Sequence, residues 1–265
     1  MTMTRRSLLG VAAGAAILRA QTEETPAQKR GREIAEKSIF ALGGDGFSQM
    51  RTRHETGRAY SFYLEQISGL SIAHIYTRYV AEGTPIKLEQ RQAFGKKQDD
   101  AVILTAASAW EVNFRGARPL GEERLKQFQE TTLHDIFYIL RERMNEPGVT
   151  FEHKGKDVVE NAPVETLEIY DAENRNVTVW IHSSTFLPVK QRFKRWDAAI
   201  NDRREEITRY TKYRESGNGV MWPHDVQRER DGLKILEMYA DKVTVGEDFK
   251  PGMFELPPGV TVLKK

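Results

Sequence analysis

The spacing of apolar residues along the chain predicts two helices in a protein that otherwise consists of strands. The first helix is expected over residues 27–42, since Thr25 and Pro26 form a helix start and the glycines at 43–44 end it. Apolar and small residues recur along it with helical spacing. Its buried face is expected to hold Ile34, Ala35, Ser38 and Leu42.

The second helical pattern runs from Gly121 to Met144, where Asn145, Pro147 and Gly148 end it. Its polar residues lie away from a wide apolar stripe. That stripe consists of Leu125, Phe128, Leu133, Ile136, Phe137, Leu140 and Met144. We expect one long helix whose apolar side covers a sheet.

The rest of the chain alternates between apolar and polar positions, which is typical of antiparallel strands. Turn-forming residues at 173–176, 216–219 and 230–232 separate several of them. The expected strands include 60–63, 74–77, 86–88, 101–105, 151–153, 165–170, 177–182, 187–196, 207–213, a segment around Val226, and 233–245. Residues 101–114 and 233–245 carry apolar residues on both faces, which predicts further layers on either side of part of the sheet.

The first twenty residues are typical of an export signal. Thr4-Arg5-Arg6-Ser7-Leu8-Leu9 resembles a twin-arginine signal, in which paired arginines precede a weakly hydrophobic segment. The uncharged run at 7–18 is shorter than the roughly 20 apolar residues of a membrane-spanning helix. We therefore expect a signal peptide over 1–20 and a single domain over 21–265, periplasmic or secreted and without a membrane anchor after processing. A buried N-terminal helix is the alternative.

Charge and cysteine content exclude several classes of protein. The leader contains three arginines and no acid, so its removal takes the formal net charge from +2 to −1. A mature chain near neutrality lacks the concentrated basic face of a nucleic-acid-binding protein. The chain has no cysteine, which excludes disulfides, thiolate zinc sites, cysteine nucleophiles and a lipid-modified N-terminal cysteine.

The sequence contains no recognisable catalytic or metal-binding motif. Its six histidines lack the i, i+4 spacing of helical zinc sites, and neither a nucleophile elbow nor a phosphate-binding loop is present. The glycines at 43–46 follow a helix and precede a strand, the reverse of the order in a nucleotide-binding loop. We expect no cofactor and no enzymatic activity; a hydrolase would need histidine and acidic residues to converge on folding.

Taken in order, several segments make the mature chain resemble the outer-membrane lipoprotein-sorting (LolA-like) superfamily. These are Leu42-Gly43-Gly44 after the first helix, strands reaching Ala109-Trp110, the helix from Gly121, Leu187-Pro188-Val189, Gly219-Val220-Met221-Trp222-Pro223 and Phe254-Glu255-Leu256-Pro257. The resemblance implies an α+β fold: a strongly curved antiparallel sheet, an unclosed barrel, with helices covering the concave face. It also implies lipid or lipoprotein acyl chains between the helices and the sheet.

The resemblance and the helix stripe together suggest a hydrophobic cavity. Its candidate residues are Leu125, Phe128, Leu133, Phe137, Leu140, Met144, Trp110, Val179, Ile181, Val189 and Phe193. The leading hypothesis is a non-enzymatic periplasmic carrier or sensor that binds a lipid or an acyl chain. The alternative is a regulatory module with a dry core that binds another envelope protein, for which Trp196 or Trp222 would be candidate contacts. Both follow from the apolar stripe, which is more often plain core than a ligand site.

Overall fold

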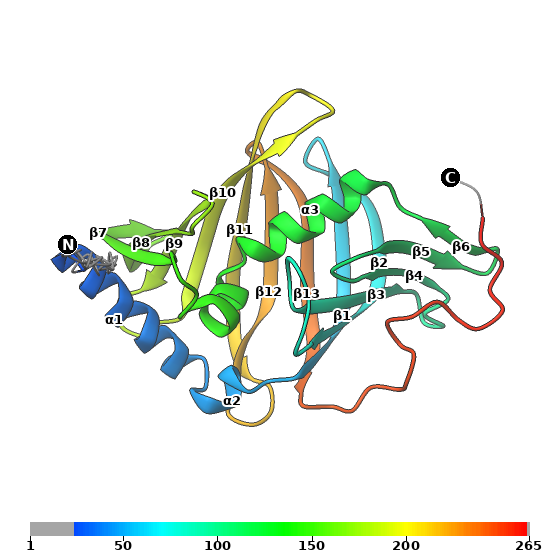
Figure 1. Ribbon diagram of the computed structural model, residues 1–265, viewed down its shortest axis with the longest axis horizontal. Helices are drawn as coiled ribbons and strands as arrows, with labels where there is room; N and C mark the ends of the chain where they lie inside the picture. Colours follow the sequence, from blue (N-terminus) through cyan, green and yellow to red (C-terminus); the bar gives the residue numbers. More distant parts are fainter. Residues whose placement is uncertain (1–23, 264–265) are drawn as a thin grey trace, which may run out of the picture.

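The computed structural model describes residues 24–263, so the predicted signal peptide with Arg5 and Arg6 lies outside the described residues (Figure 1). The described chain forms one 13-stranded sheet in the order β6-β5-β4-β3-β2-β1-β13-β12-β11-β10-β9-β8-β7. The strands are β1 Thr52–Tyr63, β2 Gln66–Tyr79, β3 Leu88–Phe94, β4 Asp100–Leu104, β5 Ala109–Asn113, β6 Gly116–Pro119, β7 Thr150–Val159, β8 Ala162–Tyr170, β9 Asn176–His182, β10 Pro188–Asp197, β11 Asp202–Glu215, β12 Met221–Arg230 and β13 Leu233–Val245.

Neighbouring strands of the sheet run antiparallel, and β6 and β7 are its outermost strands. The sheet curves strongly without closing, and the helices lie on its concave side (Figure 1). The predicted unclosed, curved antiparallel sheet is thereby confirmed. Within it, β1 pairs with β2 on one side and with β13 on the other, which joins the two halves of the chain at the middle of the sheet.

Tight turns connect the hairpins, and their backbone conformations match the residues found there. Asp231 and Gly232 both have positive φ, 49° and 79°, as a two-residue turn between twisted strands requires. Asn218 and Gly219 also have positive φ in the turn before β12. The turns predicted at 216–219 and 230–232 are therefore confirmed.

Helix α1, Pro26–Ala41, begins and ends within a residue of the prediction. The Thr25 hydroxyl accepts a hydrogen bond from the Gln28 amide, and the Gln28 side chain accepts one from the Thr25 amide, which satisfies two amides at the helix start. The four predicted face residues are all at most 1% exposed. Gly31 lets the helix approach β7, because a Cβ atom there would lie 2.3 Å from the Phe151 carbonyl oxygen. The short helix α2, Asp45–Ser48, follows.

The prediction of a single helix from Gly121 to Met144 is wrong. The segment forms α3, Glu122–Leu133, then α4, Ile136–Tyr138, and a π-helical turn η1, Ile139–Arg143. The break at Asp135 is held by its carboxylate, which accepts a hydrogen bond from the Tyr138 amide at 3.0 Å. The Ile136 amide donates to the Gln191 side-chain oxygen at 2.9 Å, so a residue of β10 replaces the lost helical bond.

The C-terminal segment, residues 246–263, covers the outer face of the sheet beside β1–β6 (Figure 1). The Arg78 guanidinium lies 4.5 Å from the centre of the Phe254 ring, and the Ala117 amide donates to the Thr261 carbonyl at 2.8 Å. This segment supplies the outer layer predicted for 101–114. The predicted second layer does not reach the start of β13, where Leu233 is 41% exposed.

Candidate ligand site on the concave face

Small side chains occupy the middle of the concave face. Gly57 pairs with Ala73, and Ala59 pairs with Ser71, across β1 and β2. On the other side of β1, Ala59 pairs with Met238 of β13. Alternation along each strand places these side chains on the face that α3 crosses. Since none except Met238 is larger than serine, the sheet leaves room above this region.

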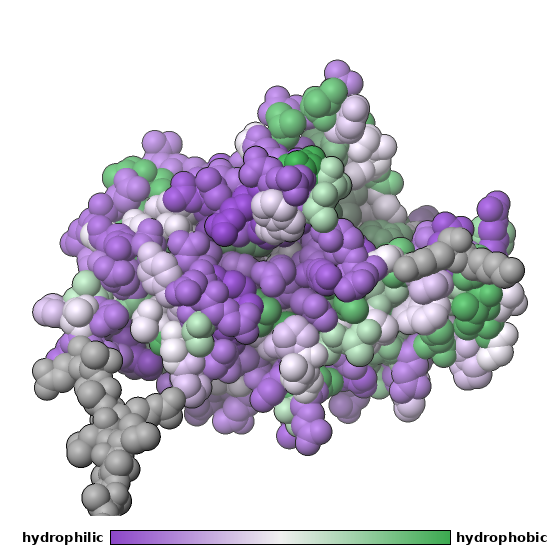
Figure 2. Space-filling view, turned by 45° about the horizontal axis from the view of Figure 1, so that its top comes forward, coloured by the Kyte–Doolittle hydropathy of each residue, from purple (hydrophilic) through white to green (hydrophobic). Residues whose placement is uncertain are grey.

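Helix α3 crosses this region of the sheet without burying its apolar stripe (Figure 1). Of its twelve residues, only Thr132 and Leu133, in the last turn, are buried. Leu125 and Phe128 face inward but stay half-buried, as do Ala59 and Ser71 on the sheet. A helix packed tightly against a sheet would bury such residues completely. The surface between α3 and the sheet therefore remains accessible, and Figure 2 shows the molecule hollowed beside the projecting hairpins.

The α4–η1 turn fills the neighbouring part of the concave face. The Phe137 ring centre lies 4.4 Å from that of Trp222 and 5.0 Å from that of Tyr210, and all three side chains are at most 4% exposed. On the far side of Trp222, the Arg53 guanidinium lies 3.8 Å from the ring centre and forms an ion pair with Glu55 at 2.8 Å. Phe137 is thus a plug that closes one side of the space under α3.

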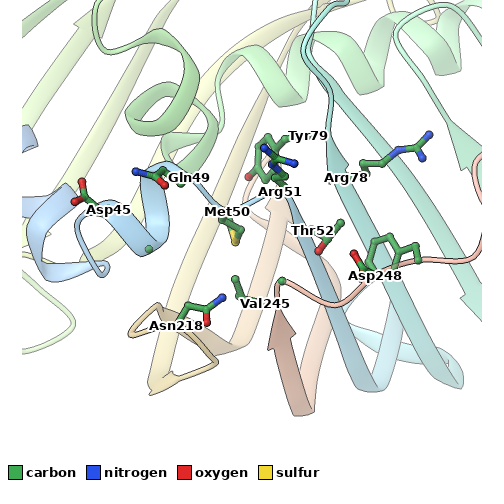
Figure 3. Close-up of a pocket in the computed structure, with 13 residues that line it drawn as sticks. Asp45, Gln49, Met50, Arg51, Thr52, Arg78, Tyr79, Asn218, Val245 and Asp248 are labelled. Atoms are coloured by element: carbon green, nitrogen blue, oxygen red, sulfur yellow. The ribbon is translucent and has the colours of Figure 1, made fainter.

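A separate cavity of about 610 Å³ opens at the lower end of β1 and β2 (Figure 3). Asp45 and Gln49 border it from the α2 side, Asp248 borders it from the C-terminal segment, and Arg51 and Tyr79 lie side by side between them. Its lining mixes these polar and charged groups with Met50, Val245 and Phe249. Because an acyl chain would desolvate the charged groups there without pairing them, this cavity suits a polar ligand better than an apolar one.

The predicted cavity residues divide into three groups. Most lie in the main core, namely Leu133, Phe137, Leu140, Met144, Val179, Ile181 and Phe193. Phe128 packs against that core while half-buried, whereas Leu125 and Val189 are half-buried and belong to neither core cluster. Trp110 packs with Ile103 and the C-terminal segment, in a separate cluster away from α3. A ligand-binding role for these residues stays a prediction, and Leu125 and Phe128 are the ones placed at the open surface.

The small residues of β1 and β2 were missed by reasoning from the sequence. The signal for them was present, since Gly57 and Ala59 alternate along one strand and Ser71 and Ala73 alternate along its neighbour. Small side chains at alternate positions of paired strands indicate a sheet face that a ligand or another part of the chain approaches closely. The helical pattern instead indicated large apolar residues, and most of these fill the core.

Within residues 24–263, no group of three or more histidine or acidic side chains could hold a metal ion. Of the buried histidines in that range, His134 hydrogen-bonds the Glu130 carbonyl at 2.7 Å and stacks on Phe193, and His224 hydrogen-bonds the Ala240 carbonyl at 2.9 Å. Such contacts fix a histidine as part of the packing. Over the same residues, no helix is both long enough and apolar enough to cross a membrane.

No model of a known protein family matches the chain, and no curated protein sequence matches it. Solved structures do match. A domain from Vibrio parahaemolyticus, provisionally described as an outer membrane lipoprotein-sorting protein, superposes with a TM-score of 0.57 at 12% identity, over 86% of this chain and 97% of that one. A DUF1329 family protein from Desulfovibrio piger superposes with a TM-score of 0.58 at 12% identity, over 87% of this chain and 98% of that one. At this identity the comparison establishes the fold alone: the chain shares the fold of these two proteins, and its sheet is the unclosed, curved antiparallel sheet that the sequence predicted.

Proposed function

We propose that the mature chain is an exported, non-enzymatic protein that binds a lipid or an acyl chain on the concave face of its sheet, beneath α3. The observation that carries this proposal is the incomplete burial of α3, whose Leu125 and Phe128 stay half-buried over a floor of small side chains. An acyl chain lying there would bury apolar surface on the helix and on the sheet at once. Each CH₂ group removed from water contributes about 0.8 kcal/mol.

The fold shared with the lipoprotein-sorting domain supports a carrier or a sensor. Because one fold serves many functions, the residues beneath α3 carry the proposal. The predicted export signal around Arg5 and Arg6 supports a role in the bacterial envelope.

A photoreactive fatty acid tests both the binding and its location. We expect it to label peptides from α3 and from the inner face of β1 and β2. Ala59→Leu should weaken labelling, because its larger side chain occupies the space under α3, while Ala81→Leu in an exposed loop should have no effect. Labelling confined to the lower cavity, or labelling that Ala59→Leu leaves unchanged, would contradict the proposed site.

A second candidate function, binding of another envelope protein, is favoured by exposed apolar residues at two hairpin ends. Tyr63 is 72% exposed and Leu64 64% exposed at the β1–β2 end, and Trp196 is 56% exposed and Ile200 46% exposed at the β10–β11 end. The apolar surface along the upper edge in Figure 2 belongs to this part of the molecule. Exposed large apolar groups that gather at one edge are typical of interaction surfaces. In that case fatty acid would fail to label the concave face, and Leu64→Asp with Trp196→Asp would abolish capture of the partner.

A further inference from the structure

Four arginines converge on the concave face at the edge of the proposed ligand site. Arg195 of β10 alternates with buried Phe193, so both side chains point inward. Arg230 of β12 pairs with inward-facing Glu206, and Arg228 pairs with Thr208 next along the same face. Arg124 comes from the first turn of α3, and the charges of Arg195, Arg228 and Arg230 act on it.

Glu206 is the carboxylate that contacts two of these guanidinium groups. It accepts hydrogen bonds from Arg195 at 3.1 Å and from Arg230 at 2.9 Å. Arg195 and Glu206 are almost completely buried. Two of the four guanidinium groups are thus held in place by one acid, which balances one of their two positive charges.

Arg124 and Arg228 have no such partner. Within residues 24–263, no carboxylate lies within 4.0 Å of either guanidinium, and the hydrogen bond of the Arg124 side chain goes to the neutral Gln127 side chain at 3.0 Å. Both side chains are accessible to solvent. Their region therefore presents two unpaired positive charges to whatever enters under α3.

The surrounding charges reinforce this imbalance. Partial desolvation, followed by the positive charges of Arg228, Arg230 and Arg195, lowers the pKa of Arg124 below its usual range. The acids that face the group are Glu206, which is already shared, Asp197, which lies 4.0 Å from Arg195 and is also bound by Arg204, and Asp135 beside α4, whose own pKa is raised by burial. Like charges held together in a partly buried place favour the binding of an anion.

Apolar surface lies directly next to the unpaired pair. Arg228 pairs with Leu236 of β13, and the next inward residues are Val226 and Met238, which pair with each other. From Met238 the same face continues to Ala59. A ligand with its charge at Arg124 and Arg228 could therefore extend an apolar chain across β13 to the small residues of β1 and β2.

We propose that the ligand is an anionic amphiphile whose carboxylate or phosphate headgroup binds Arg124 and Arg228 while its acyl chain lies beneath α3. This inference rests on the proposed function, which it makes more specific. Guanidinium groups match both headgroups, since their N–H donors can form paired hydrogen bonds with two oxygens of one anion. Arg195, Arg230 and Glu206 position the site and do not need to touch the ligand.

The test compares three probes on the purified mature chain by displacement of an uncharged fluorescent lipid: hexadecanoate, hexadecanol and acetate. We expect hexadecanoate to bind about tenfold or more tightly than hexadecanol, because hydrogen bonds to charged groups are worth about one to two factors of ten. The double variant Arg124→Gln with Arg228→Gln should lose this preference and keep its affinity for hexadecanol. Arg58→Gln with Arg192→Gln removes the same charge from exposed positions and is the control.

Each of the other outcomes would contradict one part of the proposal. Equal binding of hexadecanoate and hexadecanol would overturn the headgroup site and leave the apolar site in place. Acetate binding as tightly as hexadecanoate would mean a plain anion site, which overturns the amphiphile. Failure of both long-chain probes would overturn the proposed function itself. If circular dichroism shows that the double variant is unfolded, two further measurements test the headgroup site. Arg228→Gln alone should lose the preference for hexadecanoate, and added salt should weaken the binding of hexadecanoate to the unaltered protein.

Discussion

At the residue scale, Asp135 shows how the break after α3 constrains a single carboxyl group. Its oxygen accepts a hydrogen bond from the Tyr138 amide at 3.0 Å and so begins α4. Burial raises the pKa of Asp135, although that hydrogen bond and the charges of Arg228 and Arg53 act in the opposite direction. The folded protein therefore holds the proton of this carboxyl more tightly than the unfolded chain does.

We expect Asp135→Asn to stabilise the protein at pH 7. A carboxyl whose pKa is raised on folding favours the folded state fully below its ordinary pKa, and that contribution is lost as the pH rises through the raised value. Asparagine caps the helix equally well and carries no charge. Urea unfolding should show the advantage of the variant at pH 7 and its disappearance as the pH falls toward the ordinary value of 3.8.

The control for this effect is Asp99→Asn, which changes an exposed acid in the turn after β3. It should leave the pH dependence of stability unchanged. An Asp135→Asn protein that is less stable than the unaltered one at pH 7, with a difference that shrinks as the pH falls, would contradict this prediction and show that the carboxylate itself is required.

At the scale of elements, α3 and α4–η1 have different roles although they continue one apolar stripe. Phe128 of α3 is half-buried at the open surface, whereas Phe137 of α4 is 3% exposed between Tyr210 and Trp222. The first element covers the proposed ligand site, and the second is part of the core.

Alanine substitutions at these two phenylalanines should separate the roles. Phe137→Ala should destabilise the protein by about 3–5 kcal/mol, the usual effect of removing a buried aromatic side chain. Phe128→Ala should change stability by less than about 1 kcal/mol, since little packing is lost, but should weaken fatty acid binding. Urea unfolding and probe displacement measure the two effects, and equal destabilisation by both variants would contradict an open surface under α3.

The sequence predicted the elements whose causes are local. The start of α1 depends on Thr25 and Gln28, and the last hairpin on Asp231 and Gly232, so neighbouring residues suffice to identify both. The break within 121–144 could not be predicted in this way, because it depends on Gln191, more than fifty residues away along the chain. Periodicity identifies the inward face of a helix but not its distance from the sheet. For that reason six of the seven stripe residues were candidates for a cavity, although most of them fill the core.

At the scale of the whole molecule, the distribution of charge over the surface indicates more about the ligand than the net charge does. Without its predicted leader the chain has a formal net charge of −1, yet the concave face gathers unpaired arginines beside small apolar residues. The part of the opposite face beside β1–β6 is covered by the C-terminal segment. The concave side is thus where an acyl chain and an anionic headgroup can both be accommodated, and a ligand held there would stabilise the folded state in proportion to its affinity.

Native mass spectrometry of the mature protein, purified gently from a periplasmic extract, tests the central claim most directly. We expect a reproducible extra mass that organic extraction removes and that Ala59→Leu diminishes. A protein that carries no extra mass, and that takes up no added fatty acid, would contradict binding of an acyl chain and favour the interaction with another envelope protein.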